Sequence, residues 1–328
     1  MPWVKSEWKR WSRGYRLGAA LLLGAMSCTA TDSIAAEGEE ALRAAIFYPK
    51  QIWVQDINIM EQIAVSMENA LQEAETVHLS CYGMEELVME DAVEAAINMQ
   101  TDILIYNGID SEEAAQNYSR LQEQGIRLLL VDGDVESSGR LAYIGTDNEK
   151  AGWQAAEYID QAMGSKAVIG VIAPALDTGL QSVGARLRGF AQASRERNMK
   201  VEVYCETTYD SLTAMQRIES MLDEHPQVNV IFCGEAVSGQ AAADVVRERG
   251  LEEELTVLTY DMNSRISQDL RDRALDVTFV QDTEAVGKAC ADFLLQLAEE
   301  KNDLVPEDIL FDCIPTELED LVEESYES

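Results

Sequence analysis

Apolar and polar positions follow two different periods along this chain, and the periods alternate. Short continuous apolar runs, such as Asp102–Tyr106 (DILIY), are typical of parallel strands that are buried on both faces. Between these runs lie longer segments whose apolar residues recur every three or four positions, as in amphipathic helices. In segment 55–74 these residues are Ile59, Ile63, Met67 and Leu71. The alternation predicts parallel sheets with helices on both faces.

Eleven strands and nine helices are expected in all. The expected strands are 44–48, 76–80, 102–106, 127–131, 142–145, 167–172, 200–205, 228–233, 255–260, 277–280 and 309–314. The expected helices are 55–74, 84–99, 112–124, 148–163, 184–197, 211–224, 238–249, one around Ile266 and Leu270, and 284–299. The pattern restarts at helix 148–163 without a long linker, which indicates two lobes joined by segments that pass between them.

Polar residues directly after three of these strands are the first candidates for a site. Asp261 and Gln281 follow the two strands within Leu255–Gly287, and Asp132 follows strand 127–131. Ligands of open α/β sheets bind where the strands end. A carboxylate beside an amide offers hydrogen-bond acceptors and donors that suit a polyol. The alternative for each of the three is that it caps a neighbouring helix.

Composition narrows the class of partner. The 328 residues include 60 acidic and 25 basic side chains, giving a formal net charge of −35. Nucleic-acid binding depends on Lys and Arg that neutralise phosphates, so no nucleic-acid partner is expected. The acidity indicates a strongly hydrated surface, and the acidic C-terminal residues belong to it.

The N-terminal residues have the features of an export signal. Basic residues precede an apolar run, Leu17–Met26, which is shorter than a comfortable membrane span. The run ends close to Cys28, as in bacterial lipoprotein signals, so residues 1–28 are expected to be a signal peptide with Cys28 as the lipidation site. Residues 29–43 would then form a tether. Ordinary cleavage near Ala36 is the alternative, and both imply export.

The remaining chemistry argues against a metal site and against an enzyme. Five cysteines beyond Cys28 are scattered without a CxxC pair, and the chain has only two histidines. We therefore expect no zinc site, and we expect these cysteines to be buried free thiols. Glu235 and Asp261 could suggest a glycosidase, but no second motif supports that reading. No P-loop or complete dinucleotide fingerprint is present. We therefore expect no cofactor.

Five segments carry a resemblance to a known family. They are Tyr143–Gly152 (YIGTDNEKAG), Arg186–Phe190 (RLRGF), Val230–Ala236 (VIFCGEA), Thr259–Asp261 (TYD) and Val280–Gly287 (VQDTEAVG). In order and spacing the chain, from about Ala44 to Ile314, resembles the bacterial sugar-binding proteins of ABC transporters of the ribose/galactose type. That resemblance implies the periplasmic binding protein-like I fold, with two doubly wound parallel-sheet lobes joined by a three-segment hinge.

The resemblance also implies a ligand site and a hinge. The implied polar ring around a sugar consists of Asp132, Arg186, Glu235, Asp261 and Gln281. Tyr209 would stack on the sugar ring, with a core position as the alternative, and Trp53 could supply a second stacking surface or be buried. Asp147 and Asn148 are expected to cap the following helix and to support the hinge.

Two departures from the family pattern bear on the ligand. Glu235 stands where the family has Asn, and Ala236 stands where it has the following Asp. A carboxylate removes the donors of the amide and adds negative charge, which suggests a ligand with an amino group or a different hydroxyl pattern. The loop at 49–56, which contains Trp53, also differs from the family's.

The resulting expectation is an extracytoplasmic solute-binding protein that is not an enzyme. Lobe 1 would comprise 44–146 plus 282–309, and lobe 2 would comprise 147–281 plus 310–328, with crossings near Thr146, Gln281 and Leu310. A monosaccharide-like ligand would be held between the lobes and delivered to an ABC permease. The alternative is a sensing subunit that presents its bound state to a membrane receptor or histidine kinase. A sugar-responsive repressor would instead begin with a DNA-binding helix-turn-helix.

Overall fold

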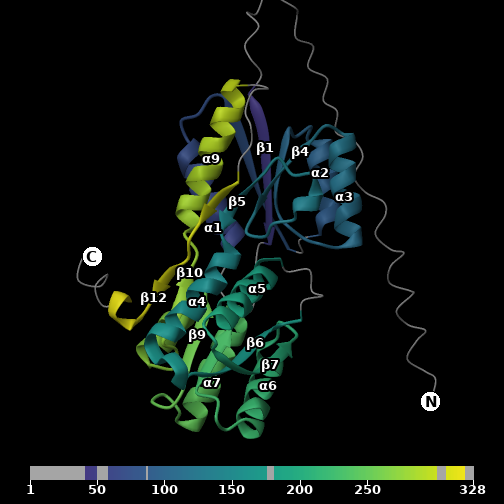
Figure 1. Cartoon of the computed structure of the whole chain (residues 1–328). Coiled ribbons are helices and arrows are strands. Elements are labelled where there is room, and N and C mark those ends of the chain that lie inside the picture. Colours follow the sequence, from purple (N-terminus) through teal and green to yellow (C-terminus); the bar gives the residue numbers. More distant parts are fainter. Residues whose placement is uncertain (1–40, 50–57, 86–87, 176–180, 301–307, 322–328) are drawn as a thin grey trace, which may run out of the picture. The chain divides into compact units, whose positions relative to one another are not determined.

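Two six-stranded sheets organise the part of the chain that the computed structural model describes, namely residues 41–49, 58–85, 88–175, 181–300 and 308–321 (Figure 1). The first sheet has the order β11-β5-β4-β3-β1-β2, and all of its neighbouring strands are parallel. Its strands are β1 (Leu42–Pro49), β2 (Val77–Met84), β3 (Ile103–Asn107), β4 (Arg127–Val131), β5 (Ala142–Thr146) and β11 (Ile309–Phe311).

The second sheet repeats this arrangement, with the order β12-β10-β9-β8-β6-β7. Its strands are β6 (Val168–Pro174), β7 (Lys200–Thr207), β8 (Val230–Cys233), β9 (Thr256–Tyr260), β10 (Val277–Val280) and β12 (Ile314–Thr316). Only β12, at the edge, is antiparallel to its neighbour. We call the half built on the first sheet lobe 1 and the half built on the second sheet lobe 2.

Helices cover both faces of each sheet (Figure 1). On the first sheet, α1 (Ile59–Leu71) and α9 (Thr283–Glu300) pack on one face, and α2 (Met89–Asn98) and α3 (Glu112–Glu123) on the other. On the second, α4 (Asn148–Met163) and α5 (Gln181–Glu196) pack on one face, and α6 (Ser211–Glu224), α7 (Ala236–Arg249) and α8 (Ser264–Arg271) on the other. Each sheet is therefore buried on both faces, which explains the continuous apolar runs.

The expected two-lobe parallel fold is confirmed, and one expected strand is wrong. The apolar run 309–314 is two strands, since β11 pairs with β5 of lobe 1 and β12 pairs with β10 of lobe 2. The break falls at Asp312 and Cys313, where the chain leaves one sheet for the other. Periodicity cannot locate such a break, because the single Asp312 between two mostly apolar strands does not show that they pair with different sheets.

Three crossings join the lobes, and two of them run side by side. The first follows Thr146 and the second lies at Gln281. The third follows Phe311, slightly later than the expected position at Leu310. The backbone N–H of Asp147 donates to the carbonyl of Phe311 at 2.8 Å, so the first and third crossings are hydrogen-bonded to each other.

The described cysteines are all free, and three of them, Cys233, Cys290 and Cys313, are buried. Cys81 and Cys205 are half-buried on the edge strands β2 and β7. Within the described ranges, no group of three or more His, Cys, Asp or Glu side chains is arranged to hold a metal ion. No helix among these residues has the length and apolarity needed to cross a membrane.

Helices α4 and α5 approach each other closely because two glycines face the opposite backbone. A Cβ at Gly189 would lie 1.8 Å from the carbonyl oxygen of Glu149, and a Cβ at Gly152 would lie 1.9 Å from that of Arg186. Contacts this short leave no room for a side chain at either position. The glycines of two family-like segments therefore fix the crossing of the helices that carry Asn148 and Arg186.

We predict that Gly189→Ala destabilises the protein, although alanine has the higher helix propensity. Overpacking against a backbone atom typically costs about 1–3 kcal/mol of the free energy of unfolding. Gln192→Ala places the same residue on the exposed side of α5 and should change stability by no more than about 0.5 kcal/mol. Urea denaturation of both variants measures the difference, and equal midpoints would contradict the close crossing.

Candidate functional site

The ends of β4, β9 and β10 bring the three strand-end candidates together. Asp132 follows β4, Asp261 follows β9 and Gln281 follows β10. The Gln281 amide donates to Asp261 Oδ1 at 2.9 Å, and its oxygen accepts from the Thr146 hydroxyl at 2.8 Å. The same side chain also acts to lower the pKa of Asp132. A lobe 1 residue, Thr146, and a lobe 2 residue, Asp261, thus share one amide from the second crossing.

Three of the predicted site residues have a left-handed backbone conformation, which is uncommon outside glycine. The φ angles are 60° at Asp132, 66° at Asp261 and 56° at Tyr209. The other described non-glycine residues with positive φ are Gln100, Asn198 and Arg273, which follow the last turns of α2, α5 and α8, where this conformation ends a helix. Asp132, Asp261 and Tyr209 instead follow strands. Sparsely populated backbone conformations of this kind cost about 1–3 kcal/mol each and cluster at binding sites.

Arg186 places a buried positive charge beside these carboxylates. The side chain is 2% exposed, and its Nε donates to Asn148 Oδ1 at 2.9 Å. Its guanidinium carbon lies 4.2 Å from the centre of the Tyr260 ring. Burial alone would lower the pKa of Arg186, but the charges of Asp261 and Asp132 contribute to a net increase in that pKa. The guanidinium is therefore held in its charged form next to the two aspartates.

The aspartate of lobe 1 is held by further polar side chains. Asn107, the last residue of β3, donates from Nδ2 to Asp132 Oδ2 at 2.9 Å. Burial raises the pKa of Asp132, Arg186 opposes that increase, and the negative charge of Asp261 adds to it. Thr146, the last residue of β5, donates from its hydroxyl to Gln281 Oε1 at 2.8 Å and so orients the amide.

Helix capping, the alternative for the strand-end residues, is performed by their neighbours. Asn263 accepts the N–H of Ile266 and caps α8. Asp282 accepts the N–H of Ala285 in the first turn of α9. Among the described hydrogen bonds, none makes Asp132, Asp261 or Gln281 a cap. Instead, Gln281 donates to Asp261, and Asp132 accepts from Asn107.

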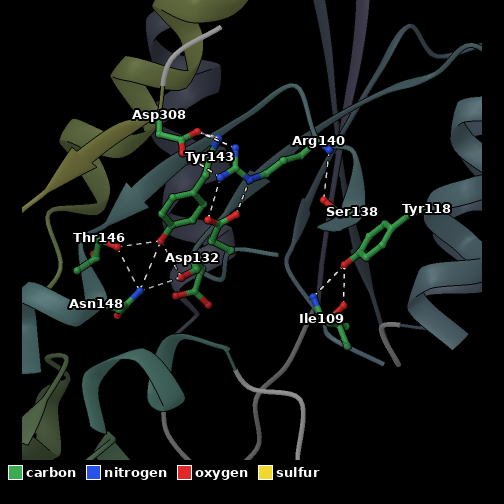
Figure 2. Close-up of polar contacts among 10 residues, drawn as sticks. Ile109, Tyr118, Asp132, Ser138, Arg140, Tyr143, Thr146, Asn148 and Asp308 are labelled. Atoms are coloured by element: carbon green, nitrogen blue, oxygen red, sulfur yellow. Dashed lines mark hydrogen bonds and ion pairs between the residues drawn. The ribbon is translucent and has the colours of Figure 1, made fainter. Parts of the chain in front are cut away.

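Asp147 and Asn148 have different roles. Asp147 is the N-cap of α4 and accepts the N–H of Lys150 at 2.9 Å. The Asn148 side chain reaches across the lobes, because its Nδ2 donates to the carbonyl of Asp132 at 3.2 Å while its Oδ1 accepts from Arg186. Figure 2 shows Asn148 beside Asp132, Tyr143 and Thr146.

Glu235 is buried and caps α7. Its carboxylate accepts the N–H of Val237 at 2.5 Å, the N–H of Ser238 at 2.9 Å and the hydroxyl of Ser238. Burial raises the pKa of Glu235 even though these hydrogen bonds oppose the increase. The start of α7 thus takes three of the roughly four acceptor positions of this carboxylate, and a contact between Glu235 and a ligand stays a prediction.

Of the two aromatic candidates and the lipidation site, the structure describes only Tyr209. Tyr209 is 44% exposed, so it is not a core residue. Desolvation of its hydroxyl raises the pKa of Tyr209, and the negative charges of Glu235 and Asp261 add to that increase. Trp53 and Cys28 lie outside the described residues.

Sequence reasoning missed three residues of the network: Asn107, Tyr143 and Thr146. Asn107 and Thr146 are the last residues of β3 and β5, so the strand-end rule that selected Asp132 would have selected both. Tyr143 carries no such signal, because it lies within β5 and reads as an apolar core position. A hollow of about 750 Å³ has Tyr143, Thr146 and Asn148 in its lining. Asp132, Arg186, Asp261 and Gln281 are not among its lining residues, so its volume does not describe the predicted sugar site.

The comparisons with known proteins agree with this fold. Residues 52–302 match the periplasmic binding protein domain family. The ribose import binding protein RbsB of Bacillus subtilis (strain 168) is 22% identical over 196 residues, which are 60% of this chain and 63% of that protein. The chain thus matches less than two thirds of the length of this relative.

Solved structures show the same fold over a larger part of the chain. The glucose-galactose binding protein GanP from Geobacillus stearothermophilus superposes with a TM-score of 0.76 at 20% identity, covering 86% of this chain and 99% of that one. The XylFII-LytSN complex gives a TM-score of 0.70 at 20% identity, with coverages of 86% and 99%.

We predict that Glu235 stabilises the protein as the N-cap of α7 even when no ligand is present. Glu235→Ala should lower the free energy of unfolding by about 0.5–2 kcal/mol, the usual cost of losing an N-cap. Glu235→Gln keeps an acceptor oxygen for the N–H groups of Val237 and Ser238 and should recover part of that loss. Chemical denaturation of the two variants tests the prediction, and a Glu235→Ala variant as stable as the wild type would contradict the capping role.

Proposed function

Because the chain belongs to the periplasmic binding protein domain family, we propose that it is an extracytoplasmic solute-binding protein that captures a monosaccharide-like ligand between its lobes and delivers it to an ABC permease. The observation that carries the proposal is the buried Arg186 guanidinium beside Asp132 of lobe 1 and Asp261 of lobe 2. The names of the relatives, which are ribose and glucose-galactose binding proteins, support a sugar as the ligand.

The residues around Arg186 offer what a hydroxylated ligand needs. Carboxylate oxygens of Asp132 and Asp261 accept hydrogen bonds from hydroxyl groups, and the guanidinium and the Gln281 amide donate them. The exposed ring of Tyr209 would cover the C–H face of the sugar, and Trp53 is the second candidate for that role. Paired carboxylates can serve a glycosidase, but no second motif supports that activity, so we propose a binder and not an enzyme.

The proposed ligand is a neutral monosaccharide rather than an amino sugar. Glu235 was the residue that suggested an amino group, and both of its oxygens accept hydrogen bonds from the start of α7. A thermal-shift screen against neutral pentoses, hexoses and amino sugars decides between the two classes. Neutral sugars should give the largest shifts, and a response restricted to amino sugars would return Glu235 to the site.

The proposed mechanism couples ligand contact to the hinge. Gln281 lies at the second crossing, and Thr146, at the first, donates to its side chain. A ligand can hydrogen-bond to Gln281 and to residues of both lobes at the same time only in some conformations of the hinge. Binding stabilises those conformations relative to the others. Hinge closure of this type would present the permease with a distinct surface in the bound state.

The second candidate function is a sensing subunit that presents its bound state to a membrane receptor or histidine kinase. One solved protein of this fold, XylFII, forms a complex with LytSN, which supports binding of a second protein by this fold. Uptake of the radiolabelled ligand in a strain lacking this gene separates the two functions. Lost uptake supports delivery to a permease, and retained uptake supports sensing.

We predict that Arg186→Ala weakens sugar binding about ten- to a hundred-fold. A hydrogen bond to a charged group contributes roughly 1.5–3 kcal/mol, and about 1.4 kcal/mol corresponds to a tenfold change in affinity. Arg195→Ala removes an exposed arginine from the last turn of the same helix and should leave the affinity unchanged. Titration calorimetry compares the two, and an unchanged Kd for Arg186→Ala would remove Arg186 from the site.

We also predict that Cys28 anchors the exported protein to the membrane. In the native host, Cys28→Ala should move the protein from the membrane fraction to the soluble extracytoplasmic fraction. Cys81→Ala removes a half-buried thiol of β2 and should leave the protein in the membrane fraction. Membrane retention of the Cys28→Ala protein would contradict the lipid anchor, and wild-type protein already in the soluble fraction would favour ordinary cleavage near Ala36.

A further inference from the structure

We propose that Tyr143 is a positioning residue for ligand binding, which, together with Asn148, holds the turn at Asp132 and aims Arg186. The inference rests on the proposed function, since it concerns the affinity of the same site. Nothing in the sequence motif assigns a role to this tyrosine, and its side chain is buried. Figure 2 shows its ring beside β5 with the hydroxyl directed towards Thr146, Asn148 and Asp132.

Two carbonyl groups from different parts of lobe 1 converge on the Tyr143 hydroxyl. The hydroxyl oxygen lies 3.1 Å from the carbonyl oxygen of Asp132 and 2.9 Å from that of Thr146. Asn148 Nδ2 lies 3.2 Å from each of the same two oxygens. Three protons, one from the tyrosine and two from the amide, therefore serve two buried carbonyls. The Asp132 carbonyl belongs to a residue in the left-handed conformation, so this bonding stabilises the strained turn.

The same bonds fix the direction of the Asn148 amide. Because Nδ2 faces the two carbonyls, Oδ1 faces the opposite way, where it accepts from Arg186 Nε at 2.9 Å. The carbonyl of Thr146 belongs to the residue whose hydroxyl donates to Gln281. One buried cluster thus contacts the Asp132 backbone directly, Arg186 through Asn148, and Gln281 through Thr146.

The local sequence makes room for this ring. A Cβ at Gly145 would lie 2.7 Å from the Tyr143 hydroxyl and 2.9 Å from its Cζ, so the ring folds back over a position without a side chain. Any larger residue at 145 would displace the hydroxyl from the two carbonyls. The pair Tyr143 and Gly145 is therefore one structural unit, which explains the glycine in the segment YIGT.

The test compares two tyrosines that bond to backbone in lobe 1. Tyr143→Phe removes the hydroxyl from Asp132 and Thr146. Tyr118→Phe removes a buried hydroxyl that donates to the carbonyl of Ile109 at 2.9 Å and accepts its N–H at 3.0 Å (Figure 2). Neither of these bonds involves Asp132, Thr146 or Asn148. For each variant, calorimetry gives the Kd for the best sugar of the screen, and thermal denaturation without ligand gives the stability.

Both variants should be less stable than the wild type, and only Tyr143→Phe should bind more weakly, by about five- to thirty-fold, the factor that corresponds to one or two lost hydrogen bonds. In a double-mutant cycle with Arg186→Lys, the combined loss of affinity should be smaller than the product of the single losses, because both changes disturb the Asn148 contact. A purely structural tyrosine would lower the melting temperature without changing Kd, which overturns the proposal.

Misfolding of the Tyr143→Phe variant and failure of the wild type to bind sugar have separate consequences. If Tyr143→Phe does not fold, Gly145→Ala, whose new Cβ displaces the hydroxyl, takes its place with the same expected loss of affinity. Wild-type protein that binds no sugar of the screen overturns the proposed function, and this inference falls with it. Wild-type binding with an unchanged Kd in Tyr143→Phe overturns the positioning role alone.

Discussion

A positive charge without access to water is the constraint on which the rest of the structure depends. Transferring a guanidinium from water to a protein interior costs several kcal/mol unless opposite charges and hydrogen bonds replace its hydration. Arg186 receives both, from Asp261 and Asp132 as charges and from Asn148 and Gly234 as acceptors, with Tyr260 beneath it. Because Asp132 follows a strand of the other sheet, negative charges from both lobes contribute to offsetting this charge.

The close crossing of α4 and α5 sets this balance. Gly152 and Gly189 let the two helix backbones touch, and this contact fixes the distance between the Asn148 and Arg186 side chains. Asp132 and Asp261 have left-handed turns, and their carboxylates accept from Asn107 and Gln281, respectively. The left-handed conformations at the strand ends are therefore unfavourable by themselves, and the packing of the helices and sheets offsets their cost.

Much of this arrangement could be predicted from the sequence, and the reason is geometric. Continuous apolar runs identify strands buried on both faces, and the residue after each run lies at the edge where sites form, which locates Asp132, Asp261 and Gln281. Glu235 follows the same rule, yet its carboxylate turns to the N–H groups of α7. Sequence position gives the place of a residue along the strand, but the partner of its side chain depends on which donors the fold brings near.

Tyr143, in contrast, could not be identified as a site residue from its position in the sequence. A tyrosine inside a buried strand reads as core, and only the three-dimensional path of two loops brings the carbonyls of Asp132 and Thr146 to its hydroxyl. The split of the run 309–314 has a similar cause, since both pieces are apolar and only the pairing partners differ.

That split affects how the chain can assemble. β11 completes the width of the first sheet and β12 that of the second, and only Asp312 and Cys313 separate them. A growing or translocating chain therefore cannot finish one lobe before starting the other, because both remain one strand short until the same late octapeptide, 309–316, arrives. The two lobes therefore share a single final step of folding, and a defect in that octapeptide would leave both sheets incomplete.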